Sequence, residues 1–330
     1  MPSLYRLVPL LVVLAALPIP AGAQSSRVLL SYDEPSVDSV GQLDWRGGLE
    51  LTGDADWHGG FSALEVDAGG TTLTVISDRG RWLRLAIDHD PRGFLIGART
   101  LASAPLNDID GQPFRRKRDR DSEGLARLPD GSLVIAFENR HRLLRYPAAQ
   151  LPFSQPPRWL TPPPGLYGAP PNGGIEALTA LTDGRLLALS EELTLHDGTT
   201  LGWVGDGRNW QSLRYRAGAG FHPTGATLLP DGDILIVERR LSIVGGFAAR
   251  LVRLTPQAIG AAAADPANTL EGTEIARLQA PLTVDNFEGI AATRAPSGET
   301  IVYLLSDDNF FALQRTLLFA FALREKPPAR

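Results

Sequence analysis

Residues 121–138 read DSEGLARLPDGSLVIAFE, and the arrangement decides the fold because it returns along the chain. A carboxylate near the start is followed by a short alternating run, a Pro-Asp-Gly turn, an apolar run and a closing carboxylate. Short β-rich runs on either side of a Gly-containing turn are typical of a β-hairpin. The near-continuous apolarity of LVIAF indicates a strand that is buried on both faces.

Four other stretches repeat this pattern: GGFSALEVDAGGTTLTVISD at 59–78, GGIEALTALTDGRLLALSE at 173–191, HPTGATLLPDGDILIVE at 222–238 and NFEGIAATRAPSGETIVYLLSD at 286–307. The polar residue near the start of each copy is its first position: Ser62, Glu123, Glu176, Thr224 and Glu288. The acid at the end is its closing position: Asp78, Glu138, Glu191, Glu238 and Asp307. First positions recur every 48 to 64 residues, and a further strand-like run follows each copy. A unit of three or four strands at this period predicts a propeller blade.

The sequence therefore predicts an all-β fold, a β-propeller of five or six blades, with five favoured. We expect the ring to close by pairing of N- and C-terminal strands, since an open edge would invite aggregation. RVLLSYDE at 27–34 is the expected partner of TLLFAFAL at 316–323. LDWRGGLELTG at 43–53 is either an extra strand or part of a degenerate sixth blade. The Ala-rich residues 257–264 are the one weak helix candidate.

The first 23 residues have the features of a secretory signal peptide: one basic residue, a short apolar run and an Ala-Gly-Ala cleavage site. We expect cleavage after Ala23, a single domain over 24–330, a periplasmic or secreted location and no membrane anchor after cleavage. The chain has no cysteine, which excludes disulfides and thiolate metal sites. Its net charge of -5 disfavours a nucleic-acid partner. We expect a monomer.

The first positions hold three glutamates, and in a propeller they would form a ring where the innermost strands line the channel. Glu123, Glu176 and Glu288 would repel one another unless a cation, bound protons or basic groups offset their charge. Oxygen ligands without His or Cys suit a hard cation, and Ca²⁺ in particular. With Asp307 they form the predicted metal site. The alternative is that repeated polar residues only cap strands and turns.

The closing acids would reach the same channel mouth, because in antiparallel strands the end of one lies beside the start of the next. Glu138, Glu191 and His222 are candidates for a general base, although a lone histidine is more often structural. Basic and amide groups that follow the closing acids are candidates for contacts with an anionic substrate: Arg79, Arg140, Arg239 and Asn309. RRKRDRD at 115–121 is either an anion-attracting rim or, as we favour, a solvated loop.

The chain resembles the bacterial proteins named for the "esterase-like activity of phytase", the phytase-like family. The resemblance rests on DSEGLARLPDG at 121–131, GGIEALTAL at 173–181, HPTGATLLPDGDILIVERR at 222–240 and DNFEGIAA at 285–292, followed by LLSDDNF at 304–310. It implies an exported propeller that hydrolyses a phosphoester or ester. The chain has no copy of the D-A-x-D-D-P-A motif of β-propeller phytases. By its central acids it is also similar to calcium-dependent lactonase propellers, without a full match to their ligand motif.

The leading hypothesis is an exported hydrolase of a small anionic phosphoester, ester or lactone, assisted by a cation at the channel mouth. Motifs of other hydrolase chemistries, G-x-S-x-G and H-E-x-x-H, are absent from the sequence. One alternative is a non-catalytic periplasmic module that binds a ligand or protein. Another is that the acids and metal are structural and the loop at 152–174 makes the functional contacts. Fold alone does not choose among them.

Overall fold

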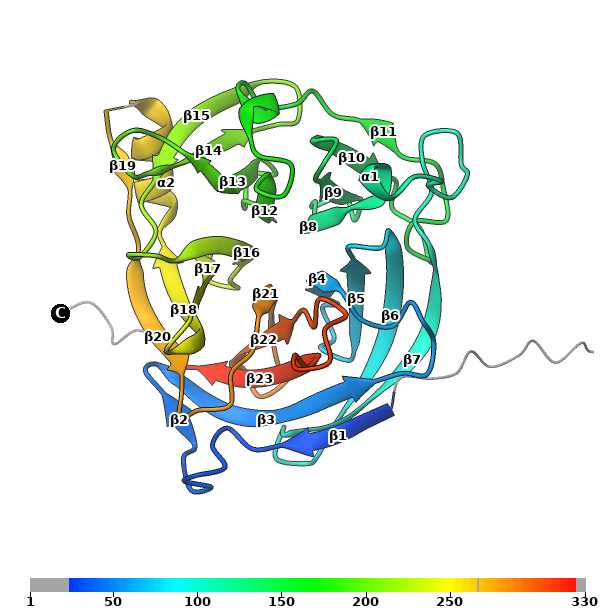
Figure 1. The fold of residues 1–330 in the computed structure, drawn as a ribbon, viewed down its shortest axis with the longest axis vertical. Helices are drawn as coiled ribbons and strands as arrows, with labels where there is room; N and C mark the ends of the chain where they lie inside the picture. Colours follow the sequence, from blue (N-terminus) through cyan, green and yellow to red (C-terminus); the bar gives the residue numbers. More distant parts are fainter. Residues whose placement is uncertain (1–23, 266, 325–330) are drawn as a thin grey trace, which may run out of the picture.

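Five sheets, antiparallel except for one short parallel pair at an outer edge, stand around a central axis in the computed structural model, which describes residues 24–265 and 267–324 (Figure 1). Each sheet is one blade, so the prediction of a five-bladed propeller is confirmed. The predicted signal peptide, residues 1–23, lies outside the described residues. No helix in the described part of the chain is long and apolar enough to cross a membrane.

The first three blades follow one another along the chain, each beginning with its innermost strand. Blade 1 contains β4 (Phe61–Val66), β5 (Thr72–Ser77), β6 (Arg81–His89) and β7 (Leu95–Pro105). Blade 2 contains β8 (Ser122–Arg127), β9 (Leu133–Phe137), β10 (Arg142–Tyr146) and β11 (Arg158–Trp159). Blade 3 contains β12 (Ile175–Ala180), β13 (Leu186–Thr194), β14 (Thr200–Gly205), β15 (Trp210–Tyr215) and β19 (Thr269–Leu270).

The last two blades complete the ring. Blade 4 contains β16 (His222–Leu228), β17 (Ile234–Ser242), β18 (Gly246–Leu254) and β20 (Thr273–Gln279). Blade 5 contains β21 (Phe287–Arg294), β22 (Thr300–Ser306), β23 (Leu317–Leu323), β3 (Leu43–Thr52) and β1 (Gln24–Val28), and β2 (Ser39–Val40) pairs with β3. The helical segments are α1 (Lys117–Arg120), α2 (Pro256–Ala264) and the 3₁₀ turn η1 (Leu166–Gly168). The Ala-rich helix was predicted.

The ring closes within blade 5, where β3 from the N-terminal part pairs with β23 from the C-terminal part. Closure between N- and C-terminal strands was predicted, but the strand assigned to it was wrong. β1 pairs with the outer side of β3 and is mostly exposed, whereas Leu43, Leu49 and Leu51 of β3 are buried. Burial on both faces favours the more apolar strand in the inner position.

The core lies between adjacent sheets rather than in a single centre. Tyr303 and Leu318 of blade 5, for example, pack in one cluster with Leu83 of blade 1. Trp203 of blade 3 packs with Ala136 of blade 2 in another. Because these interfaces lock each blade to the next, the innermost strands β4, β8, β12, β16 and β21 hold fixed places around the axis (Figure 1).

Candidate functional site

A β-bulge interrupts the innermost strand of every blade at the same place. The pairing between the first and second strands of each blade shifts register around the first-position residue: Ser62, Glu123, Glu176, Thr224 and Glu288. A bulged residue is left out of the ladder, and its side chain is re-aimed. The three glutamates at these bulges, Glu123, Glu176 and Glu288, lie together near one end of the central channel.

A cavity of about 610 Å³ occupies this end of the channel. Both predicted sets of acids contribute to it, since the second strand of each blade ends beside the start of the first. Eight carboxylates and three basic side chains line it, together with three asparagines. The lining residues are Asp78, Lys117, Arg118, Asp121, Glu123, Glu138, Asn139, Asn172, Glu176, Glu191, Arg239, Glu288, Asp307 and Asn309.

Burial and mutual repulsion raise the pKa values of several carboxylates of this cavity. Burial, followed by the neighbouring Glu138 and Glu288, raises the pKa of Glu123 well above its ordinary value. Burial also raises the pKa of Glu138 to about 8, that of Glu288 to about 7 and that of Asp78 to about 6. The pKa of Glu176 is likewise raised well above its ordinary value, by burial and by Glu191. The cavity thus favours a bound positive charge.

Several of these carboxylates lack the hydrogen bonds that usually accompany burial. Among the described residues, no side chain or backbone N–H donates to Glu123, and Oε2 of Glu176 is buried without a partner. Oδ1 of Asp78 is also buried and unpartnered. Other acids are held by one bond each: Gly174 N donates to Glu138 at 2.5 Å, and Asn286 Nδ2 to Glu288 at 2.8 Å. Free acceptor oxygens therefore remain in the cavity.

Arg239 is the basic group at the inner wall of the cavity. Its Nη2 donates to Oε1 of Glu191 at 2.5 Å, and its Nε lies 3.9 Å from Oε1 of Glu288. Asn309 also lines the cavity, and its backbone N–H donates to Asp307 at 2.7 Å. Arg239 offsets one of the negative charges, which leaves the acids in excess.

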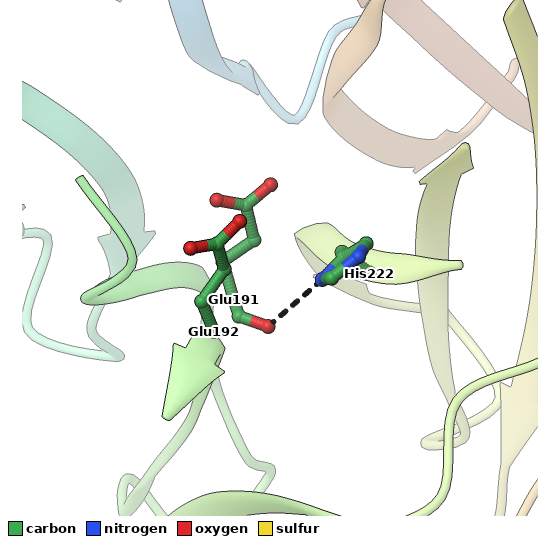
Figure 2. Close-up of side chains that lie close together, drawn as sticks. All are labelled: Glu191, Glu192 and His222. Carbon is green, nitrogen blue, oxygen red and sulfur yellow. Dashed lines mark hydrogen bonds between the residues drawn. The ribbon is translucent and has the colours of Figure 1, made fainter. Parts of the chain in front are cut away.

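His222 lies beside the cavity rather than in its lining. Figure 2 shows its ring next to Glu191 and Glu192, with Nδ1 3.2 Å from the backbone oxygen of Glu191. Within the described residues, these three side chains form the one group of His, Asp or Glu whose ligand atoms all lie within 4.8 Å of one another. The predicted ligands Glu123, Glu176, Glu288 and Asp307 surround a wider space.

Two predicted substrate contacts lie outside the cavity. Arg79 stacks on the Phe310 ring at 3.2 Å and donates to the backbone oxygen of Asp56. Arg140 is exposed and pairs with Asp119. Both arginines follow a closing position but do not line the cavity. Their contact with a substrate stays a prediction.

The closing acid of blade 4 has a structural place. Glu238 is buried and accepts hydrogen bonds from the Tyr215 hydroxyl and the Gly218 backbone, and it pairs with Arg250. It does not line the cavity. The contacts of Glu238 agree with the alternative that some of the repeated acids have only a structural role.

Sequence reasoning missed several residues of the cavity. Asp121, which accepts a hydrogen bond from Asn139, opens the repeated unit two residues before Glu123 and is not among the predicted site residues. Asn172 comes from the long Pro-rich loop. Lys117 and Arg118 belong to the basic segment favoured as a solvated loop, but they line the cavity from α1. The signal that could have indicated their place is that this basic segment comes directly before a first-position acid, Glu123.

A family model described as "Phytase-like: Esterase-like activity of phytase" matches residues 56–310, well over half of the chain. Among curated proteins, none matches the sequence significantly.

Solved propeller structures are similar at low identity. A gluconolactonase from Xanthomonas campestris is 12% identical, with a TM-score of 0.42 over 90% of this chain and 100% of that one. A PQQ-bound aldose sugar dehydrogenase from Streptomyces coelicolor is 15% identical, with a TM-score of 0.45 over 92% and 99%. A virginiamycin B lyase from Staphylococcus aureus is 10% identical, with a TM-score of 0.42 over 90% and 99%. Similarity at this level says nothing about chemistry.

Proposed function

The chain belongs to the phytase-like family, and we propose that it is a cation-dependent hydrolase of ester bonds that works in the central cavity. The family supports a hydrolase-type propeller. The observation that carries the rest is the cluster of carboxylates in this cavity, in which buried oxygens of Glu176 and Asp78 have no hydrogen-bond partner. The substrate class we propose is a small phosphoester, ester or lactone.

The residues of the cavity fit a hard divalent cation, and Ca²⁺ best. The donors are carboxylate oxygens, which Ca²⁺ prefers in flexible geometry with six to eight ligands. Oε2 of Glu176 is buried without a partner, and Glu123 accepts no hydrogen bond from any described residue. Glu123, Glu176, Glu288 and Asp307 are the residues that would hold the ion. When bound, such a cation polarises a substrate oxygen and lowers the pKa of a water.

The remaining groups have chemistry suited to acid–base work and to orientation. Glu138 has a pKa raised to about 8, close to the working pH at which a general acid or base is most effective. Glu191 holds Arg239 in place through the 2.5 Å ion pair, so that the guanidinium can contact an anionic part of the substrate. Asn139 and Asn309 offer neutral hydrogen bonds in the same lining. His222, with Nδ1 facing a backbone oxygen, is a second candidate base.

The experiment measures the metal content of the purified protein and its melting temperature with and without EDTA. We expect stoichiometric Ca²⁺, a lower melting temperature after chelation, and turnover on a panel of phosphoesters, esters and lactones that stops with EDTA. Glu288→Gln should abolish metal-dependent turnover. A metal-free protein indifferent to EDTA and to added Ca²⁺ would overturn the proposal. Tight binding without turnover on any ester would instead favour the non-catalytic binding module.

We also propose that the protein acts in the periplasm or outside the cell, on the basis of the first 23 residues. Intact mass of protein recovered outside the cytoplasm should match a chain that begins at Gln24. Retention of Met1 in protein from the native host would contradict export by this route.

A further inference from the structure

A second pocket, of about 300 Å³, lies next to the central cavity and is lined by arginine and aromatic side chains. The two spaces share a wall at two points of the chain. Asp78 lines the central cavity and the next residue, Arg79, lines the outer pocket. In the same way Asp121 lines the cavity and Arg120, the residue before it, lines the outer pocket. At these two points the acidic residue lines the central cavity and the neighbouring arginine lines the outer pocket.

The three arginines of the outer pocket form no close ion pair, although Asp78 and Asp121 across the wall interact electrostatically with Arg79 and Arg120. No carboxylate among the described residues lies within 4.0 Å of the guanidinium nitrogens of Arg79, Arg81 or Arg120, although eighteen such pairs involve other arginines. The Nε atoms of Arg81 and Arg120 are buried without a hydrogen-bond partner. Burial lowers the pKa of Arg81. Like charges gathered around one pocket, with unsatisfied donors, favour a bound anion.

Aromatic rings fix two of these guanidiniums. Arg81 stacks on Trp57, with 4.6 Å from its central carbon to the ring centroid, and Arg79 stacks on Phe310 at 3.2 Å. Stacking engages the flat face of a guanidinium and leaves its N–H groups free at the edge. Those donors are therefore held in place before a ligand arrives. Preorganisation of this kind reduces the entropy lost on binding.

The remaining wall is apolar, and this bears on what the anion is attached to. Pro105, Pro113 and Phe114 line the pocket beside the arginines. The lining has a single acidic residue, Asp56, whose backbone oxygen accepts the hydrogen bond from Arg79. A small pocket with one cationic side and one apolar side is suited to an organic anion rather than to a free inorganic ion.

We propose that the outer pocket binds a small organic phosphate, with the phosphate among Arg79, Arg81 and Arg120 and the apolar part against Pro105 and Phe114. A phosphate dianion has three terminal oxygens and can be shared by three guanidiniums, whereas a carboxylate presents two oxygens to one fork. The inference does not depend on hydrolysis in the central cavity. It concerns binding, and it can be tested on protein without metal.

The test is isothermal titration with phenylphosphonate, which has no ester bond to hydrolyse, alongside inorganic phosphate and benzoate. We expect phenylphosphonate to bind more tightly than either of the others. Arg81→Gln and Arg120→Gln should each weaken its binding about tenfold or more, because hydrogen bonds to charged groups are the stronger class. Arg84→Gln is the matched control: Arg84 lies on the same strand as Arg81 but donates to Gln150 outside the pocket.

Repeating the titration after EDTA treatment, with the fold checked by circular dichroism, separates this pocket from a phosphate held by a central cation. Binding that persists without metal and is lost in the two arginine variants supports the proposal. Binding of phenylphosphonate next to Trp57 should also change the tryptophan fluorescence of the native protein. Trp57→Phe should remove this change. The proposal is overturned if phenylphosphonate does not bind, if Arg81→Gln and Arg120→Gln bind it like the native protein, or if EDTA abolishes its binding while the fold persists.

Discussion

Glu176 is a residue at which burial of a carboxyl group lowers the stability of the fold. Its carboxyl is buried at the cavity wall, its pKa is raised, and one of its oxygens has no partner. A buried group in this condition costs free energy unless something else in the cavity offsets its charge. A cation would do so, and in its absence a proton must.

We therefore predict that Glu176→Gln stabilises the metal-free protein. The neutral amide needs no proton, so it removes the free energy that proton uptake by native Glu176 costs when the metal-free protein folds, and the melting temperature in EDTA should rise by about 2 °C or more. In the same variant, added Ca²⁺ should raise the melting temperature less than in the native protein. Differential scanning fluorimetry with and without Ca²⁺ measures both effects. A variant that is less stable in EDTA would contradict the prediction.

Glu238→Gln is the control for this change. Glu238 occupies the closing position of blade 4 and is also a buried glutamate, but Tyr215, Gly218 and Arg250 satisfy its carboxylate. Removing one partner of a buried ion pair leaves the other uncompensated. The same chemical substitution should therefore lower the melting temperature here, by a similar amount with and without Ca²⁺.

At the residue scale, the sequence was informative where the repeat was regular. Eight of the eleven predicted site residues line one cavity, including Glu123, Glu176 and Glu288. Arg79 and Arg140 do not line it, and a position in a repeat does not tell which way a side chain turns after a strand ends. Asn172 could not be predicted, since its place depends on the path of a long loop that has no copy elsewhere in the chain.

At the scale of the strand, the small residue after each first position explains how the innermost strands approach one another. A Cβ atom on Gly225 would lie 2.1 Å from the backbone oxygen of Glu288, and one on Gly124 would lie 2.8 Å from that of Glu176. Neighbouring blades therefore approach backbone to backbone at the bulge itself. The strands that carry Glu176 and Glu288 each pack against a glycine of the blade before.

Gly225→Ala should accordingly disturb both the fold and the cavity. The added methyl group must displace the backbone of Glu288, and overpacking of this kind costs about 1–3 kcal/mol. Chemical denaturation should show the loss, and the Ca²⁺-induced rise in melting temperature should become smaller. The matched control is Gly260→Ala in α2, where an added Cβ meets nothing within 4 Å. That variant should gain up to about 1 kcal/mol, because alanine is the better helix former. Equal effects in the two variants would contradict the argument.

Hairpins, turns and the repeat itself were predictable from the sequence because strand periodicity and Gly-containing turns are local properties. The bulge was not predicted. It changes neither the alternation that marks a strand nor the turn that ends it, and it appears only when the second strand is paired with the first. The recurring small residue after each first position, Ala63, Gly124, Ala177, Gly225 and Gly289, was the signal that could have indicated it.

At the scale of the whole molecule, the cavity makes stability depend on pH. In the metal-free protein the pKa of Glu138 is about 8 and that of Glu288 about 7, both above their ordinary values. Between the ordinary pKa of 4.5 and these raised values, the folded state binds more protons than the unfolded state. The free energy of unfolding therefore falls as pH rises through this range. His58 and His89, whose pKa values burial lowers, stay neutral above about pH 7 and do not oppose the trend.

We predict that the melting temperature in EDTA falls between about pH 6.5 and about pH 8.5. Saturating Ca²⁺ should reduce this fall, because a bound cation replaces the protons on the carboxylates. Glu138→Gln should reduce it as well, since the variant has one fewer titrating group in that range. Thermal scans at several pH values, in EDTA and in Ca²⁺, provide the measurement. A metal-free protein that becomes more stable over this range would exclude the assigned protonation.

The pairing of β3 with β23 has a consequence for the order in which the molecule is made. Ribosomes deliver residues 43–52 long before residues 317–323, an interval on the order of tens of seconds at typical rates of synthesis. Throughout that time the edge of β3 that will pair with β23 has no partner, and for most of it two members of the acidic cavity, Glu288 and Asp307, do not yet exist. Neither ring nor cavity is therefore complete until the last strand arrives. A chain interrupted late in synthesis keeps unpaired strand edges that proteases and chaperones recognise, so quality control can separate finished from unfinished molecules.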